Sequence, residues 1–167
     1  MRPFLRALLI VAVAVSGGAA AGAAAAEPRL QVLTYGTYET DKGRRVPMPK
    51  SISGQMNLLS HVKHKQTTAE VFGRLGESFG LEYIIHGVPA GAMITVRTRH
   101  PMLTNPQTGA RMDYGEREQE ADPGERRYTG YTFDDTYEIA EGEWTIEFAY
   151  KGRVFHQQKF KVIVPVN

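Results

Sequence analysis

The stretch Gly142-Glu143-Trp144-Thr145-Ile146-Glu147-Phe148-Ala149-Tyr150 decides the fold class of this chain of 167 residues. Large apolar side chains stand at every second position from Trp144 to Tyr150, with smaller or polar residues between them. Successive side chains of a β-strand point to opposite faces, so this alternation predicts a strand with one face in the core and the other toward solvent.

The chain is expected to reverse directly after this strand. Lys151-Gly152 predicts a tight turn into Val154–Val164, where Phe160, Val162 and Val164 repeat the alternation. The two segments are therefore predicted to form a hairpin. Phe155 and Phe160 have opposite parity, which predicts a bulge or bend at Gln157-Gln158.

The same two-residue period recurs toward the N-terminus. Phe79–Ile85 has four large apolar residues on one face, and Gly87–Gly91 predicts a reversal because its glycines and proline favour turns. Ile94–Arg99 is expected to return as the second strand of this pair. Further strands are predicted at Tyr131–Ile139, interrupted at Asp134-Asp135, and at Leu30–Glu39 and within Leu58–Val71. About seven short strands with no convincing helix predict an antiparallel β-sandwich.

Two segments are rich in turn-forming and charged residues and are expected to be irregular. Asp41–Gly54 is predicted to link the first strand to the rest, which divides the chain into a leader (1–26), an N-terminal strand with an irregular linker (27–57) and a sandwich body (58–167). His100–Arg126 exceeds the usual loop limit of about 12–15 residues. We expect a mobile loop there, so that deleting Met112–Glu125 leaves the melting temperature nearly unchanged.

The first 26 residues have the three parts of a secretory signal peptide. Arg2 and Arg6 give a positive start, Ala7–Val15 is apolar, and Ala24-Ala25-Ala26 satisfies the small-residue cleavage pattern. An uncleaved anchor is the alternative, but the second half of the segment is mostly alanine and glycine, which add little membrane-transfer energy. We therefore predict cleavage near Ala26, a periplasmic or secreted protein, and no stable membrane insertion.

The composition narrows the function classes. Arg2 and Arg6 account for the net charge of +2, so the processed chain is neutral and lacks the basic excess of nucleic-acid-binding proteins. The sequence contains no cysteine, which excludes disulfides, thiol nucleophiles and cysteine metal sites. It also contains no G-x-S-x-G, Walker, H-E-x-x-H or EF-hand spacing, so neither a catalytic residue nor a cofactor is predicted.

A set of short pieces suggests a family. In order, the sequence contains Tyr35-Gly36-Thr37-Tyr38, Phe79-Gly80, Gly87-Val88-Pro89-Ala90-Gly91, His100-Pro101, Asn105-Pro106 with Gly109, Gly130-Tyr131-Thr132-Phe133, and Gly142-Glu143-Trp144 with Phe148. Together they resemble the domain-of-unknown-function family numbered 3859, which consists of exported bacterial proteins. The likeness covers most of Leu30–Val164, but Met112–Glu125 and His61–Lys65 do not match it. The resemblance implies an immunoglobulin-like β-sandwich and a Gram-negative periplasmic setting, and it implies no activity or cofactor.

Two clusters of possible ligands raise the alternative of a metal site, and neither is predicted to be one. His61 and His64 form an H-x-x-H spacing, but residues three apart in a strand point opposite ways, and Lys63 and Lys65 would repel a cation. We expect these lysines to protect an exposed strand edge. The acidic residues of Asp113–Glu125 suggest calcium, but interleaved arginines indicate a self-neutralising loop.

The outward face of Ile94–Arg99 is the main candidate surface. Arg97 and Arg99 alternate with Thr98, and Glu82 on the neighbouring predicted strand is expected opposite one of them. A solvated cross-strand ion pair accounts for this pattern. The functional alternative is a small patch that binds an anion or a partner and has a titratable histidine. The candidate patch consists of Glu82, Arg97, Arg99, His100, Asn105 and Tyr128.

Aromatic residues raise the alternative of carbohydrate binding, since aromatic faces stack on sugars. Tyr131, Tyr137 and Trp144 fall at core parity, and Tyr128 alone has outward parity. Exposed aromatic clusters are what would indicate a sugar platform, and burial accounts for three of these four residues.

The function predicted from the sequence is a non-catalytic binding or protein-interaction module of the bacterial envelope. It would present Pro101–Arg126 or an exposed sheet edge to an envelope protein or polymer. The alternative from another class is a metal-assisted hydrolase that uses His100, Asp134 or Asp135 with the acidic loop. An enzyme should bring such groups together in one concave pocket.

Overall fold

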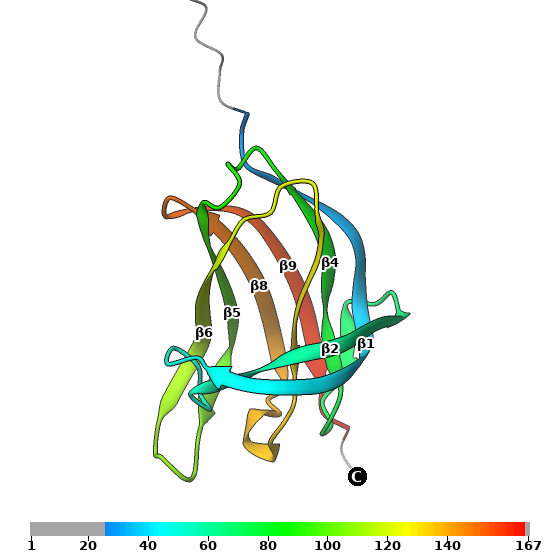
Figure 1. The fold of residues 1–167 in the computed structure, drawn as a ribbon. Coiled ribbons are helices and arrows are strands. Elements are labelled where there is room, and N and C mark those ends of the chain that lie inside the picture. Colours follow the sequence, from blue (N-terminus) through cyan, green and yellow to red (C-terminus); the bar gives the residue numbers. More distant parts are fainter. Residues whose placement is uncertain (1–25, 166–167) are drawn as a thin grey trace, which may run out of the picture.

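Two β-sheets packed face to face make up the described part of the protein (Figure 1). The structure is a computed structural model and describes residues 26–165, so the predicted signal peptide, apart from Ala26, lies outside the described residues. The first sheet has the strand order β2 (Gln55–Gln66), β1 (Arg29–Pro47), β4 (Ser78–His86), β7 (Arg126–Thr132). The second has the order β3 (Glu70–Phe72), β9 (Arg153–Ile163), β8 (Gly142–Tyr150), β5 (Met93–Thr104), β6 (Arg111–Glu120). The predicted all-β sandwich is confirmed.

Neighbouring strands run antiparallel, with the exception of β3 and β9, which are parallel. A single 3-10 turn, η1 (Thr136–Glu138), connects β7 to β8. Among residues 26–165, no helix has the length and apolar character that crossing a membrane requires.

Side chains from both sheets alternate into one core, as the two-residue period predicts. The inward side chains of β4 are 2% exposed or less, and three of those of β8 are fully buried. Burial of a large apolar side chain contributes roughly 1.5–3 kcal/mol, so this shared core is the main source of stability. The residues concerned are Phe79, Leu81, Tyr83 and Ile85 on β4, and Trp144, Ile146 and Phe148 on β8.

Trp144 lies at the centre of an aromatic cluster that joins the two sheets. Its ring centroid is 5.7 Å from Phe79 of the first sheet and 4.8 Å from Tyr131. Its indole Nε1 donates a 3.0 Å hydrogen bond to the carbonyl oxygen of Ala140, so the one polar atom of the side chain is satisfied.

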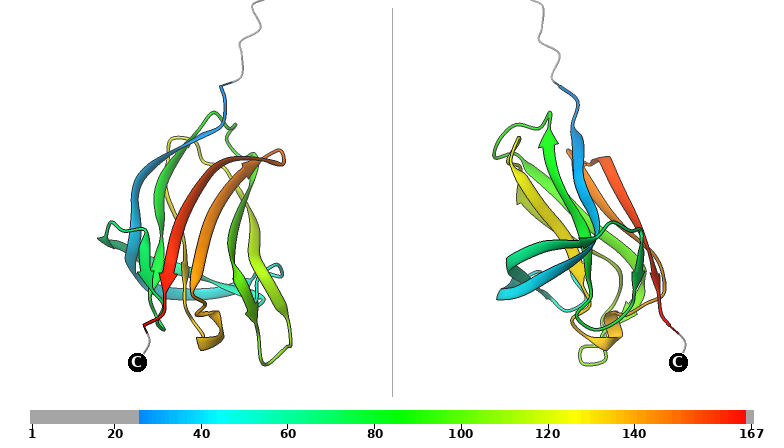
Figure 2. Two further views of the ribbon diagram at one scale, coloured as in Figure 1. Left: turned by 180° about the vertical axis from the view of Figure 1, so that it is seen from behind. Right: turned by 90° about the vertical axis from the view of Figure 1, so that its right-hand side faces the viewer.

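The second half of β1 leaves the sandwich with β2 as a hairpin, which we call the arm (residues 38–66). The first half of β1 pairs with β4, and the pairing with β2 begins at Thr37. Gly36 permits the change of direction because its φ of +133° is open to glycine and strained for other residues. In Figures 1 and 2 the arm runs across the side of the sandwich. Asp41–Pro47 is thus strand, and the prediction of an irregular linker there was wrong.

The segment predicted as a mobile loop, His100–Arg126, is mostly strand. β5 continues to Thr104, and β6 pairs with it in antiparallel fashion. The turn between them is fixed by Asn105, whose Oδ1 accepts hydrogen bonds from the backbone nitrogens of Gln107 (2.9 Å) and Thr108 (3.3 Å). Asn105 itself is buried, so this turn is an ordered part of the domain.

The second predicted hairpin was wrong in its pairing. β4 and β5 both form where expected, but they lie in different sheets, so Gly87–Gly91 crosses from one layer to the other. The hairpin of β8 and β9 is confirmed. Its bulge lies at Phe155, because Phe148 pairs with His156 and Ala149 with Val154, and not at the predicted Gln157-Gln158.

The predicted strand Tyr131–Ile139 ends early. β7 stops at Thr132, and η1 follows Asp134-Asp135. The buried carboxylate of Glu138 accepts hydrogen bonds from the backbone nitrogens of Asp134 (2.8 Å) and Asp135 (3.2 Å), which stabilises the turn in place of a strand.

Candidate functional site

The six residues of the predicted patch do not form one surface. Glu82 and Tyr128 lie on the first sheet, and Arg97 and Arg99 lie on the outward face of the second. His100 and Asn105 are buried. Because β4 and β5 belong to different sheets, Glu82 does not face Arg97 or Arg99, and the predicted ion pair between them was wrong.

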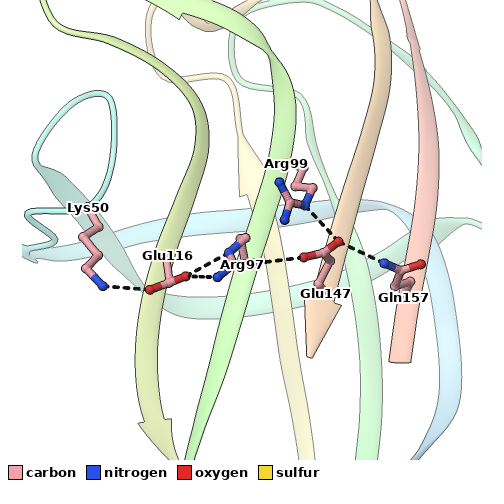
Figure 3. A network of polar contacts seen from close by, with 6 residues as sticks. All are labelled: Lys50, Arg97, Arg99, Glu116, Glu147 and Gln157. Carbon is pink, nitrogen blue, oxygen red and sulfur yellow. Dashed lines mark hydrogen bonds and ion pairs between the residues drawn. The ribbon is translucent and has the colours of Figure 1, made fainter. Parts of the chain in front are cut away.

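The outward face of the second sheet carries a network of charged groups, shown in Figure 3. At its centre is Glu147 of β8, which is only 5% exposed although it points away from the core. Its Oε1 accepts hydrogen bonds from Arg99 Nε (3.0 Å) and Gln157 Nε2 (2.9 Å), and its Oε2 lies 3.6 Å from Arg97 Nη1. The two predicted arginines thus share a carboxylate from the next strand.

Glu116 of β6 extends this network to the arm (Figure 3). Its carboxylate lies 2.8 Å from Lys50 Nζ and 2.5 Å from Arg97 Nη2, and these cations hold the pKa of Glu116 below its ordinary value. The backbone nitrogen of Glu116 also donates a 2.8 Å hydrogen bond to the carbonyl oxygen of Lys50. These contacts fasten the tip of the arm to the edge of the second sheet.

Glu82 and Tyr128 belong to a different cluster, on the first sheet. Glu82 forms an ion pair with Arg126 (2.5 Å) and accepts a 2.7 Å hydrogen bond from Thr34. The ring of Tyr128 packs edge-on against Tyr38 at 4.7 Å, and this burial raises the pKa of Tyr128. Because Tyr128 is covered and Trp144 is fully buried, the aromatic residues weighed for sugar binding do not form an exposed platform.

A cavity of about 140 Å³ lies between the arm and the side of the sandwich, where the edge strands β6 and β7 face each other. The arm lies directly on β6 there: Met48 Cε and the Lys50 carbonyl oxygen are within 3.6 Å of the position that a Cβ on Gly115 would occupy. The lining is partly apolar, from Met48, Ile52, Met56, Leu59 and Val96, and partly polar, from Thr98, His100, Arg117, Thr129, Asp134 and Glu138.

Arg117 is the most unusual residue of this cavity. It pairs with Val96 in the β5–β6 register, so its side chain shares the inward face of the sheet with a core residue. Its guanidinium donates hydrogen bonds to Gln119 Oε1 and to Thr129 Oγ1 (2.8 Å). Burial lowers the pKa of Arg117, since desolvation disfavours the charged form.

His100 lines the cavity on its core side. Its ring lies 4.9 Å from the ring of Trp144, and its Nδ1 is 2.9 Å from the carbonyl oxygen of Pro101. Burial lowers the pKa of His100, so the imidazole is neutral and its Nδ1 carries the hydrogen that Pro101 accepts. The Nε2 atom is then a hydrogen-bond acceptor.

Asp134 and Glu138 lie in the connection between β7 and β8 and also line the cavity. Asp134 is paired with Lys42 and Asn57 of the arm, and Glu138 holds η1. Desolvation raises the pKa of Glu138, an effect that its backbone hydrogen bonds oppose. Both carboxylates therefore hold parts of the fold together.

The residues that could have been metal ligands are not brought together into one site. His61 is exposed, whereas the ring of His64 packs against Tyr38 at 5.2 Å. Asp122 forms an ion pair with Arg127, and Glu116 is neutralised as described above. Within the part of the chain that the structure describes, no group of three His, Asp or Glu residues is arranged to hold a metal ion.

Arg117 was not predicted as a site residue. The sequence predicts a self-neutralising loop here, whereas β6 places Glu116 outward and Arg117 inward. No apolar–polar alternation marked this placement, because polar or charged residues stand on both faces, with Gly115, Arg117 and Gln119 inward and Tyr114, Glu116 and Glu118 outward.

Comparison with known proteins supports the architecture. An immunoglobulin-like protein from Pseudomonas aeruginosa has a similar solved structure, with a TM-score of 0.62 and 26% sequence identity over 84% of this chain and 99% of that chain. No functionally curated protein is significantly similar to the chain. The model of the family described as a domain of unknown function, DUF3859, matches residues 26–162, and the chain therefore belongs to this family of immunoglobulin-like β-sandwiches.

Proposed function

We propose that this protein is a non-catalytic binding module of the bacterial envelope and that it binds its ligand in the cavity beneath the arm. The observation that carries the proposal is the cavity itself, which is bordered by the arm, β5, β6 and β7 and is lined by a mixture of apolar and polar groups. Binding sites for small ligands combine an apolar lining with a few polar groups that orient the ligand.

The way in which the arm is attached supports this proposal. Its tip is held by Lys50 at Glu116, and its strands are held by Lys42 and Asn57 at Asp134. These polar contacts stand at the rim, and the arm buries two large apolar side chains of its own, Tyr38 at 2% exposure and Ile52 at 4%. A cover held by a few polar contacts can open at a modest cost in free energy.

The contacts of the residues that a hydrolase would use also favour a binding function over a catalytic one. The carboxylate of Asp134 is paired with the arm, the Nδ1 of His100 is bonded to the backbone, and Asp135 is exposed at the start of η1. A general acid or base needs a proton-accepting group free to reach its substrate. The pairing of Asp134 suits a structural role, and it leaves His100, whose Nε2 is free, without that carboxylate as a partner.

The place of action belongs to the proposal as well. Met1–Ala26 has the pattern of a cleavable leader, and the rest of the chain is neutral, so we propose a periplasmic protein whose ligand is an envelope component and not a nucleic acid. Expression of the full chain in a Gram-negative host tests this. The periplasmic fraction should contain a protein that begins at Glu27, and retention of the first 26 residues would contradict export with cleavage.

A cavity-filling variant tests the binding site. The protein, recovered from the periplasm and measured by native mass spectrometry, should carry an additional small mass. Thr98→Phe places a large side chain into the cavity, whereas Thr95→Phe, the matched control, adds the same group on the outward face of the same strand. Thr98→Phe should lose the additional mass and Thr95→Phe should retain it.

Two results would contradict the proposed site: wild-type protein without any bound mass, or a mass that Thr98→Phe retains. If Thr98→Phe fails to fold, as a melting curve would show, Met56→Trp fills the cavity from the side of the arm and replaces it in the comparison.

A further inference from the structure

We infer that the ligand of the cavity carries a single carboxylate on a small apolar body and that Arg117 binds this carboxylate. The inference rests on the proposed function, because it names the chemistry of a ligand at the same site. It is carried by the position and partners of one guanidinium group.

Arg117 differs in the charge of its partners from the other arginines of the domain that contact a neighbouring side chain. Those arginines each pair with a carboxylate, namely Arg74 with Glu77, Arg97 with Glu116, Arg99 with Glu147, Arg126 with Glu82 and Arg127 with Asp122. The partners of Arg117 are a neutral amide and a neutral hydroxyl. Among residues 26–165, no carboxylate lies within ion-pair distance of its guanidinium.

A largely buried charge without a counterion is costly, and buried charges in proteins are usually paired. A guanidinium has five N–H donors in a planar fork, and Gln119 and Thr129 use two of them. The remaining donors suit a carboxylate, which accepts two parallel hydrogen bonds from such a fork. The missing counterion therefore corresponds to a group that a ligand can supply.

The fork is held in place before any ligand binds. Gln119 accepts from Arg117 with its Oε1, and its Nε2 donates a 3.0 Å hydrogen bond to the hydroxyl of Tyr83, a core residue of β4. Thr129, the other acceptor, is 5% exposed. Both anchors lie on strands, so the donors of Arg117 are oriented by rigid elements of the fold.

The charges around the cavity favour a single negative charge at this end. The lysine of the lining, Lys42, is already paired with Asp134 at 2.5 Å. Asp134 and Glu138 lie in the β7–β8 connection and would repel an anion from that end. One guanidinium neutralises one carboxylate, whereas a doubly charged phosphate group would keep a charge that nothing here balances.

The rest of the lining describes the remainder of the ligand. Met48, Ile52, Met56 and Val96 supply apolar surface, and the volume of about 140 Å³ admits a short chain or the end of a longer one. A small aliphatic acid and the C-terminal residue of a peptide share this chemistry. The two sources are separated by the choice of probe.

The test is a titration of the full mature chain, followed by nuclear magnetic resonance, with hexanoate and with 1-hexanol as the uncharged match. Wild-type protein should bind hexanoate more tightly than hexanol, with shifts at β6 and β7. Arg117→Gln should weaken hexanoate binding by about tenfold or more and leave hexanol binding unchanged, because only the charged hydrogen bonds are lost. Arg111→Gln removes an exposed arginine of the same strand and should change neither affinity.

Two results overturn the inference: wild-type protein that binds hexanoate no more tightly than hexanol, or Arg117→Gln with unchanged hexanoate affinity. If Thr98→Phe abolishes the binding of both probes while the first result holds, the cavity is a binding site and only the carboxylate assignment fails. Should Arg117→Gln not fold, Arg117→Lys keeps the charge without the fork and is expected to weaken hexanoate binding alone.

A comparison of two peptides distinguishes the two sources of the carboxylate. A tripeptide ending in leucine is compared as the free acid and as the C-terminal amide. Binding of the free acid more tightly than hexanoate, with loss on amidation, indicates a peptide C-terminus, and binding of hexanoate alone indicates a free aliphatic acid. Either result supports recognition of the carboxylate by Arg117, provided that the Arg117→Gln substitution abolishes the binding.

Discussion

Asn57 of β2 donates a 2.6 Å hydrogen bond to Oδ2 of Asp134, which lies 77 residues further along the chain. The other oxygen of Asp134 lies 2.5 Å from Lys42 Nζ, on the opposite strand of the arm. One carboxylate at the end of β7 thus holds both strands of the arm over the cavity. We therefore expect this contact to control how readily the arm separates from the sandwich.

Removal of this carboxylate should loosen the arm and leave the core intact. Asp134→Ala is expected to raise hydrogen exchange of the β2 amides about tenfold to a hundredfold, because a hydrogen bond to a charged group contributes about 1.5–3 kcal/mol. The exposed Lys42 adds little, since ion pairs at a surface contribute about 1 kcal/mol or less. The amides of β8 should exchange as in the wild type.

Glu141→Ala is the control for this measurement, because Glu141 is an exposed carboxylate close to the same connection. Its β2 amides should exchange at the wild-type rate. Equal protection of β2 in Asp134→Ala and in the wild type would show that the arm is held by other contacts.

Acidification should destabilise the domain through His100. Burial holds the pKa of His100 below its ordinary value of 6.5, and His156 is shifted in the same direction by the same cause. Below pH 6.5 the unfolded chain takes up protons that the folded state resists, so the free energy of unfolding decreases as the pH falls toward the folded pKa. Above pH 6.5 both states are neutral at these positions and the effect disappears.

His100→Asn should flatten this dependence, because asparagine retains a donor for the carbonyl oxygen of Pro101 and does not titrate. The measurement is the unfolding free energy in urea at several values between about pH 5 and about pH 7. His61→Asn, which changes an exposed histidine, is the control and should keep the wild-type slope. An unchanged slope in His100→Asn would assign the acid sensitivity to other groups.

The parts of the fold that could be predicted from the sequence are the strands with one face in the core. Apolar and other residues alternate in Phe79–Ile85 and Trp144–Tyr150 because one face of each strand is buried in the core. Parity alone therefore placed Trp144 and Ile146 correctly inside. β6 could not be found in this way. As an edge strand it carries charged or polar residues on both faces, and the alternation of apolar with polar residues disappears.

The arm and the candidate site required information that local patterns do not contain. The strands of the arm lie largely outside the core, so their register is set by contacts with each other and with Asp134 and Glu116. Arg117 becomes a site residue only through its pairing with Val96, a relationship between two strands. The division of charges between the two faces of β6 therefore had to come from the structure.

Deletion of Met112–Glu125 should abolish folding, in contrast to the expectation from the sequence. The deletion removes nearly all of β6, the ion pairs of Glu116, and Ala121, which is fully buried. Loss of β6 would expose the edge of β5 and uncover part of the core. We expect no cooperative melting transition by circular dichroism.

A milder change to the same strand provides the control. Glu118→Gln and Glu120→Gln, which alter exposed side chains of β6 and keep the backbone, should each shift the unfolding free energy by no more than about 0.5 kcal/mol. A deletion mutant that melts like the wild type would mean that β6 does not contribute to the sandwich.

Trp144 should be the most sensitive single position of the core. Its side chain is fully buried between the sheets, with ring contacts to Phe79 and Tyr131, and Trp144→Ala is expected to lower the unfolding free energy by about 3–5 kcal/mol through lost burial and an unfilled cavity. Trp144→Phe refills most of that volume but leaves the carbonyl oxygen of Ala140 without its donor, so an intermediate loss is expected in the same urea titration. Tyr150→Ala, at the partly exposed end of the same inward face, should cost less than either change. A loss below about 1 kcal/mol for Trp144→Ala would place this side chain outside the core, because truncation of a buried tryptophan costs several times that amount.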